Sequence, residues 1–113
     1  MQKPSPLEGS LANKSQTGEY YVDSSIASLS GSSQLLLAEQ PSRGALLIMN
    51  IGNANIGIAF AAPQATATAA IGSSGTFTLA PGVSFEPDGG VIPLNAVYVI
   101  GTAGQPVTCV YSN

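Results

Sequence analysis

The residues in this sequence whose side chains could catalyse a reaction or bind a metal are few and lie apart from one another. Two carboxylates, Glu86 and Asp88, lie on either side of Pro87. Carboxylates beside a glycine-rich turn can bind Ca²⁺ when carbonyl oxygens complete the shell, and a carboxylate pair can cleave glycosidic bonds. Two acids within one turn rarely flank a substrate, however, and Asp88-Gly89 is a common turn dipeptide. We therefore interpret this pair as a turn and a strand end, and we expect no metal site.

Neither the serines nor the single cysteine has a partner that would activate it. The sequence contains no histidine, so the usual general base and the commonest metal ligand are both missing. The stretch Gly72-Ser73-Ser74-Gly75 differs in spacing from the nucleophile elbow G-x-S-x-G. Cys109 lies in the alternating stretch Val107–Tyr111, which predicts a small packing residue. With no phosphate-binding glycine motif either, we expect a protein that is not an enzyme and uses no cofactor.

The charged residues exclude two classes of partner. Lysine and arginine number three, Asp and Glu number six, and the net charge is −3. Binding to nucleic acid or to an anionic membrane requires a basic face, and the only cations are Lys3, Lys14 and Arg43. No apolar run approaches the ~20 residues of a membrane-spanning helix. We expect no nucleic acid and no membrane as a partner.

The surface of the folded chain must be unusual, because only 8% of the residues are charged while 44% are hydrophobic. An average soluble domain has about 25% charged residues. The surface is either solvated by uncharged polar side chains or buried against copies of the chain or another protein. We favour burial, because the apolar fraction is high as well.

The N-terminal residues 1–18 differ from the rest of the chain. They include two prolines and follow neither a helical nor a strand period. We predict an extended N-terminal arm, with Leu7 and Leu11 as its only sizeable apolar groups, that either contacts a neighbouring molecule or is a disordered tail. The first six residues lack the apolar stretch of a secretory signal, so we expect a protein made and used without that export route.

Residues 19–113 are predicted to form one β domain. Short apolar or alternating runs are separated by Gly, Pro, Asn or Ser about every ten residues, and no stretch keeps a helical stripe. This pattern is typical of an all-β fold, an antiparallel β-sandwich of the jelly-roll kind. The predicted strands are Glu19–Ile26, Gln34–Ala38, Ala45–Ile51, Ile56–Phe60, Thr76–Leu79, Val83–Glu86, Val91–Ile92, Ala96–Ile100 and Val107–Tyr111.

An ordered set of short motifs follows in the same region. The segment Arg43–Phe60 reads RGALLIMNIGNANIGIAF, Thr78–Phe85 reads TLAPGVSF, and Val91-Ile92-Pro93 precedes the AVYVIG of Ala96–Gly101. Taken in order, these motifs resemble small virion proteins of tailed bacteriophages. The resemblance covers roughly residues 43–112 and leaves residues 1–42 unmatched.

The resemblance implies a structural role without a catalytic residue. It implies a capsid decoration (cement) protein that binds the outer capsid surface of the virion as a homotrimer, with the major capsid protein and copies of itself as partners, after synthesis in the host cytoplasm. The alternative is a head-fibre or tail-associated module that binds a receptor or a carbohydrate. The candidate interaction residues are Leu7, Leu11, Tyr20, Tyr21 and Arg43.

Overall fold

The computed structural model describes residues 20–87 and 91–113. These residues form eight strands and no helix, so no helix among them could cross a membrane. The strands are β1 (Tyr21–Asp23), β2 (Gln34–Leu37), β3 (Ala45–Met49), β4 (Ile56–Phe60), β5 (Thr76–Leu79), β6 (Ser84–Phe85), β7 (Val97–Ile100) and β8 (Thr108–Ser112).

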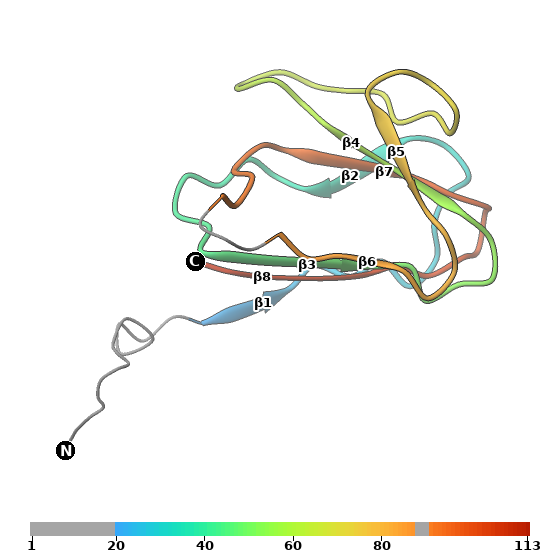
Figure 1. The fold of residues 1–113 in the computed structure, drawn as a ribbon, viewed down its shortest axis with the longest axis horizontal. Coiled ribbons are helices and arrows are strands. Elements are labelled where there is room, and N and C mark those ends of the chain that lie inside the picture. Colours follow the sequence, from blue (N-terminus) through green and yellow to red (C-terminus); the bar gives the residue numbers. More distant parts are fainter. Residues whose placement is uncertain (1–19, 88–90) are drawn as a thin grey trace, which may run out of the picture.

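The strands form two four-stranded sheets packed face to face (Figure 1). One sheet has the order β1-β8-β3-β6 and the other β2-β7-β4-β5, and all neighbouring strands are antiparallel. Successive strands alternate between the sheets, except that β4 pairs directly with β5. This is the jelly-roll arrangement of a β-sandwich, so the predicted fold class is confirmed. The predicted arm, residues 1–18, lies outside the described residues.

The core lies between the inner faces of the two sheets. Strand β3 shows the alternation that builds it: Leu46 and Ile48 are buried, whereas the residues between and beside them are half-buried on the outer face. Ile48 pairs with Cys109 of β8, and both are fully buried. Burial of one such aliphatic side chain contributes about 1.5–3 kcal/mol. The packing role predicted for Cys109 is confirmed.

A tight turn carries the chain from β5 in one sheet to β6 in the other. Ala80 accepts a hydrogen bond from the Val83 N–H at 3.0 Å, with Pro81 and Gly82 between them. Gly82 has φ of 80°, which is the third position of a type II turn and favours glycine. The Pro-Gly pair in the sequence therefore sets this crossover locally.

The outer face of the β2-β7-β4-β5 sheet is covered by the chain itself. Gly57 and Ala59 of β4 point outward yet are buried. The β4–β5 connection lies over them (Figure 1), held where the Ala69 N–H donates to the Ser33 hydroxyl at 2.8 Å. A Cβ at Gly57 would lie 3.1 Å from Ile71 of this connection. The small residues in β4 therefore let a third layer approach the sheet closely.

The strand predicted at Val91–Ile92 is wrong. These residues are irregular, with Val91 exposed and Ile92 packed against the core. Pro93 follows directly and has no N–H to donate to a ladder. The apolar pair therefore contributes a core contact without pairing as a strand.

Candidate functional site

The predicted interaction residues of the N-terminal region are only partly within the described residues. Tyr20 and Tyr21 lie at the start of β1 with 80% and 71% of their surface exposed. Leu7 and Leu11 lie outside the described residues. Two adjacent exposed tyrosines fit a contact surface, since their rings are large and lose little entropy on ordering. Their contact with another molecule stays a prediction.

Arg43, the remaining candidate interaction residue, is enclosed within the subunit and only 4% exposed. Its guanidinium donates to the carbonyl oxygens of Pro93 at 2.6 Å, Asn95 at 3.1 Å and Ala38 at 2.8 Å. It also lies 5.6 Å from the ring centre of Tyr111, at cation–π distance. Burial lowers the pKa of Arg43, but a guanidinium remains charged at neutral pH. Arg43 thus joins the β2–β3 and β6–β7 connections at one end of the sandwich, and a contact with another molecule stays untested.

Cys109 has no access to solvent. Its N–H donates to the Ser25 hydroxyl at 2.9 Å, and its carbonyl accepts the Ser24 N–H at 2.7 Å. Burial raises the pKa of the thiol to about 12, although the charge of Arg43 acts in the opposite direction. A protonated, enclosed thiol is a poor nucleophile and a poor metal ligand.

The carboxylate pair singled out in the sequence is described only in part. Glu86 follows β6 and is exposed, whereas Asp88 lies outside the described residues. Among residues 20–87 and 91–113, no group of three or more His, Cys, Asp or Glu side chains comes together. The absence of a metal site therefore stays a prediction.

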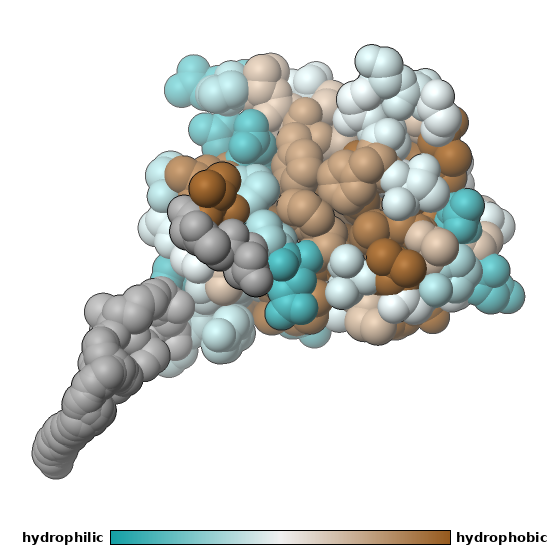
Figure 2. Space-filling model, viewed as in Figure 1, coloured by the Kyte–Doolittle hydropathy of each residue, from teal (hydrophilic) through white to brown (hydrophobic). Residues whose placement is uncertain are grey.

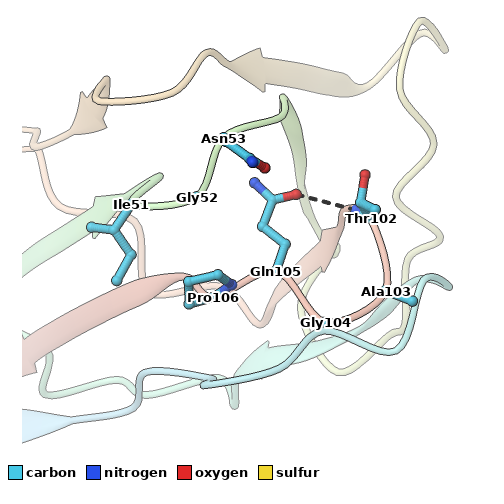
Figure 3. A pocket seen from close by; sticks show the side chains of 8 residues that line it. All are labelled: Ile51, Gly52, Asn53, Thr102, Ala103, Gly104, Gln105 and Pro106. Carbon is cyan, nitrogen blue, oxygen red and sulfur yellow. Dashed lines mark hydrogen bonds between the residues drawn. The ribbon is translucent and has the colours of Figure 1, made fainter.

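An open cleft of about 570 Å³ lies at one end of the sandwich, between the β3–β4 and β7–β8 connections (Figure 3). Ile51 and Pro106 lie on one side of Gln105 in this view, and Thr102 and Ala103 on the other. Most of the lining is main chain or small side chains, and no charged residue contributes to it. The cleft therefore offers hydrogen-bonding groups without a reactive side chain.

The polar groups at the base of this cleft bind each other. Asn50 is fully buried and donates to the carbonyls of Ala54 and Leu79, each at 2.8 Å. Its Oδ1 accepts the Gln105 side-chain amide at 3.0 Å, and the Gln105 Oε1 accepts the Thr102 N–H at 3.2 Å. Sequence analysis missed this pair. The only indication was a polar amide placed directly after the apolar strand that ends at Met49.

A cluster of three aromatic rings lies between the two sheets, where edge strands β5 and β6 face one another. Phe60, Phe77 and Phe85 are half-buried, with ring centres 5.2 to 5.8 Å apart. Figure 2 shows apolar side chains gathered in the middle of the face that it presents. The rings close the sandwich on this side, and their partial exposure leaves apolar surface at its edge.

The outer face of the β1-β8-β3-β6 sheet has no cover among the described residues. We call this the bare face and define it by its outward side chains, which are the apolar or aromatic Tyr21, Ala45, Leu47, Met49 and Val110 and the polar Asp23, Ser84, Thr108 and Ser112. A shallow groove of about 230 Å³ crosses it, and Glu86 lines the end opposite Tyr21. An antiparallel sheet that faces water normally carries polar residues outward. On the bare face, half-buried Leu47, Met49 and Val110 lie among polar side chains, and Tyr21 is exposed beside them, so this face is a candidate contact surface.

Comparisons with known proteins find a similar fold but do not assign the chain to a family. No protein-family model matches the sequence, and no curated protein matches it. The chain is similar to a solved structure from work on Bacillus endospore appendages, described as a novel family of disulfide-linked pili. That structure is 19% identical, the match covers 84% of each chain, and the TM-score is 0.54. At this identity the likeness shows a shared fold.

This comparison overturns the bacteriophage interpretation. The structure that shares the fold comes from a bacterial endospore appendage and is not a phage protein. The predicted decoration (cement) role, the homotrimer on a shell, the major capsid protein as partner and the location on a virion made in a host cytoplasm are therefore wrong. The alternative, a head-fibre or tail-associated module, is wrong for the same reason.

The motifs that carried the resemblance belong to the fold. Arg43 opens the first motif and joins the β2–β3 and β6–β7 connections, and Asn50 in the same motif makes four side-chain hydrogen bonds after β3. The Pro81-Gly82 pair of the second motif forms the β5–β6 turn. Residues that shape turns and strand ends specify a fold, and a fold does not by itself specify a function. The motif residues therefore have structural roles in this fold, and the function inferred from them was wrong.

Proposed function

We propose that this chain is a non-enzymatic structural subunit that associates with copies of itself into a bacterial surface appendage. The observation that carries the proposal is the bare face, an outer sheet surface that exposes part of Leu47, Met49 and Val110 on a chain with very few charges. Of the four charged residues in the described range, Arg43 is buried, so only Asp23, Glu39 and Glu86 contribute charge to the described surface. A surface of this kind is stabilised by protein neighbours.

Two further observations support the proposal. The fold is shared with a protein of an endospore appendage, a structure described as pili, and a pilus is a polymer of subunits. The sequence also has no histidine, the commonest general base, and its one thiol is buried and protonated. A role in assembly needs neither group.

The proposed assembly differs in chemistry from disulfide-linked pili. These 113 residues contain one cysteine, and one cysteine per chain can link two chains but cannot join a continuous polymer. Cys109 is also fully buried in the core. We therefore expect the contacts between subunits to be non-covalent and insensitive to reducing agents.

The test is the mass of the purified chain as a function of concentration, measured by light scattering with and without a reductant. We expect the mass to rise with concentration equally in both conditions, with filaments visible by electron microscopy. Leu47→Lys, which places a charge at the centre of the bare face, should raise the concentration needed for association at least about tenfold, a cost of about 1.4 kcal/mol. Leu35→Lys is the matched control, because Leu35 is exposed on the other sheet.

A chain that stays monomeric at every concentration would contradict the proposal. Equal loss of association in Leu47→Lys and Leu35→Lys would remove the bare face as the contact surface. A drop in mass on adding the reductant would contradict the non-covalent assembly.

A further inference from the structure

Met49 is the one methionine among the described residues, and it lies on the bare face. It ends β3, an inner strand of its sheet, between β8 and β6. Its partners across the two ladders are Thr108 on β8 and Ser84 on β6, and both have short side chains. Met49 itself is half-buried and Ser84 is exposed. No bulky cross-strand partner therefore screens the longer thioether side chain from solvent.

The hydrophobic core does not use Met49. Leu46 and Ile48, the inward residues of β3, belong to the buried core cluster. Met49 is neither in that cluster nor among the partly buried residues packed against it. A change in the polarity of this side chain should therefore alter the outer surface and leave the packing between the sheets intact.

A thioether reacts with a peroxide without help from a catalytic residue. The sulfur donates an electron pair to one oxygen of hydrogen peroxide, the O–O bond breaks and an S–O bond forms. The departing oxygen takes both hydrogens and leaves as water, so the sulfur loses two electrons and the peroxide gains them. The sulfoxide is polar where the thioether was apolar, and methionine sulfoxide reductases reverse the change.

The other sulfur of the described chain does not compete for the oxidant. Cys109 has no exposed surface, and burial raises the pKa of its thiol to about 12. The thiolate is the form of cysteine that reacts, so a protonated and enclosed thiol is slow. A peroxide therefore reaches Met49 first among the sulfurs of residues 20–87 and 91–113.

The position of Met49 decides what its sulfoxide would do. Two residues before it on the outer side of β3 lies Leu47, which pairs with Val110 of β8. These three half-buried apolar side chains form the part of the bare face that a second copy would cover. Covering a sulfoxide removes water from its oxygen, and burial of a polar group opposes the contact.

We propose that Met49 is a reversible oxidation site, and that its sulfoxide blocks self-association through the bare face. The oxidant is of the peroxide class. In an assembly a second copy would cover the thioether, so oxidation and association exclude one another. The regulatory part rests on the self-association proposed above, whereas the reactivity of Met49 in the single subunit does not.

The site is tested on the full chain at a concentration below association. Hydrogen peroxide is the probe, free methionine in the same solution is the reference, and tandem mass spectrometry locates each added oxygen. We expect Met49 to gain one oxygen at a rate within about tenfold of that of free methionine, because the rate follows exposure. We expect none on Cys109. A slower reaction of Met49 than this would mean that the thioether is shielded, and it overturns the proposal.

The effect on association is measured by light scattering of the oxidised and the untreated chain. We expect the oxidised chain to need an about tenfold higher concentration to associate. Treatment with both methionine sulfoxide reductases should restore the original value, since each epimer of the sulfoxide needs its own enzyme. An unchanged concentration after oxidation overturns the proposal.

Met49→Leu is the matched control, because it keeps an apolar side chain of similar volume without the sulfur. This variant should associate like the untreated chain both before and after exposure to peroxide. An equal loss of association in the treated variant would mean that the oxidation acts at another residue, which contradicts the role of Met49.

Urea unfolding separates a blocked surface from a damaged fold. We expect the oxidised chain to keep the unfolding midpoint of the untreated chain, since Met49 lies outside the core. A lower midpoint would mean that association is lost through unfolding, and it overturns the proposal. If the untreated chain never associates, the proposed function fails and the regulatory role fails with it, while the mass measurement still decides the oxidation site.

Discussion

The two sheets of this jelly roll have similar inner faces and very different outer faces. The outer face of β2-β7-β4-β5 is covered by the β4–β5 connection, and small residues in β4 allow that connection to approach closely. The outer face of β1-β8-β3-β6 carries larger apolar residues and has no cover among the described residues. One sheet has a covering layer over the small residues of β4, although Leu35 in β2 stays exposed, and the other sheet has no such layer among the described residues. We expect the covered face to contribute more to stability and the bare face to carry the proposed association.

Adding bulk should separate the two faces most strongly. Gly57→Val places a Cβ 2.8 Å from the Thr76 methyl and 3.1 Å from Ile100 on the covered face. We expect the free energy of unfolding to fall by about 3 kcal/mol from this overpacking. The matched substitution on the bare face, Ala45→Val, should change it by less than about 0.5 kcal/mol. Urea denaturation of both variants measures the difference, and equal losses would mean that the faces are packed alike.

Removing the anchor of the covering connection should have a smaller effect. Ser33→Ala leaves the buried N–H of Ala69 without its acceptor. An unpaired buried N–H costs about 1–2 kcal/mol, and we expect that loss in urea denaturation, with faster hydrogen exchange in the β4–β5 connection. Ser33→Thr keeps the hydroxyl and serves as the control. Unchanged exchange in Ser33→Ala would show that other contacts hold the connection.

The pH dependence of the free energy of unfolding tests how well the β1-β8-β3-β6 sheet keeps water from the core. Cys109 lies on its inner side, and burial raises the pKa of the thiol from 9.0 to about 12. In the folded state the Cys109 thiol keeps its proton to a higher pH than in the unfolded chain. Its contribution to the free energy of unfolding is therefore complete below pH 9 and is lost between pH 9 and 12. The loss at pH 10 should be about 1 kcal/mol relative to neutral pH.

The control for this pH effect is Cys109→Ala, in which the tyrosines still ionise but the thiol is gone. Denaturation of both proteins at pH 7 and pH 10 isolates the contribution of Cys109. An equal change in the free energy of unfolding between pH 7 and pH 10 in the two proteins would mean that water reaches the thiol through the β1-β8-β3-β6 sheet.

The strands could be predicted because short stretches of the sequence determine where they begin and end. Alternation in β3 and β5, together with turns such as Pro81-Gly82, places side chains and crossovers without reference to distant residues. The covered face could not be predicted, because Gly57 and the alanines of the β4–β5 connection have too little bulk to indicate a packed layer. Its packing depends on contacts between residues far apart in the sequence.

The candidate site was predicted less well than the fold. Arg43 is a candidate interaction residue in the sequence, and in the fold three main-chain carbonyls accept hydrogen bonds from its guanidinium. Those carbonyls come from two separate connections, and no local pattern indicates that they converge. The bare face was equally hidden, because the sequence of β3 does not say which of its two apolar sides receives a cover.

The enclosed Arg43 has a consequence for proteolysis. A protease of the trypsin type must draw a basic side chain into its acidic specificity pocket, and Arg43 is the only basic residue from position 20 to the end of the sequence. Its guanidinium is bound inside the folded sandwich, so cleavage after it requires unfolding first. The native sandwich should thus pass through this class of protease uncut, and a cut at Arg43 would report each molecule that opens.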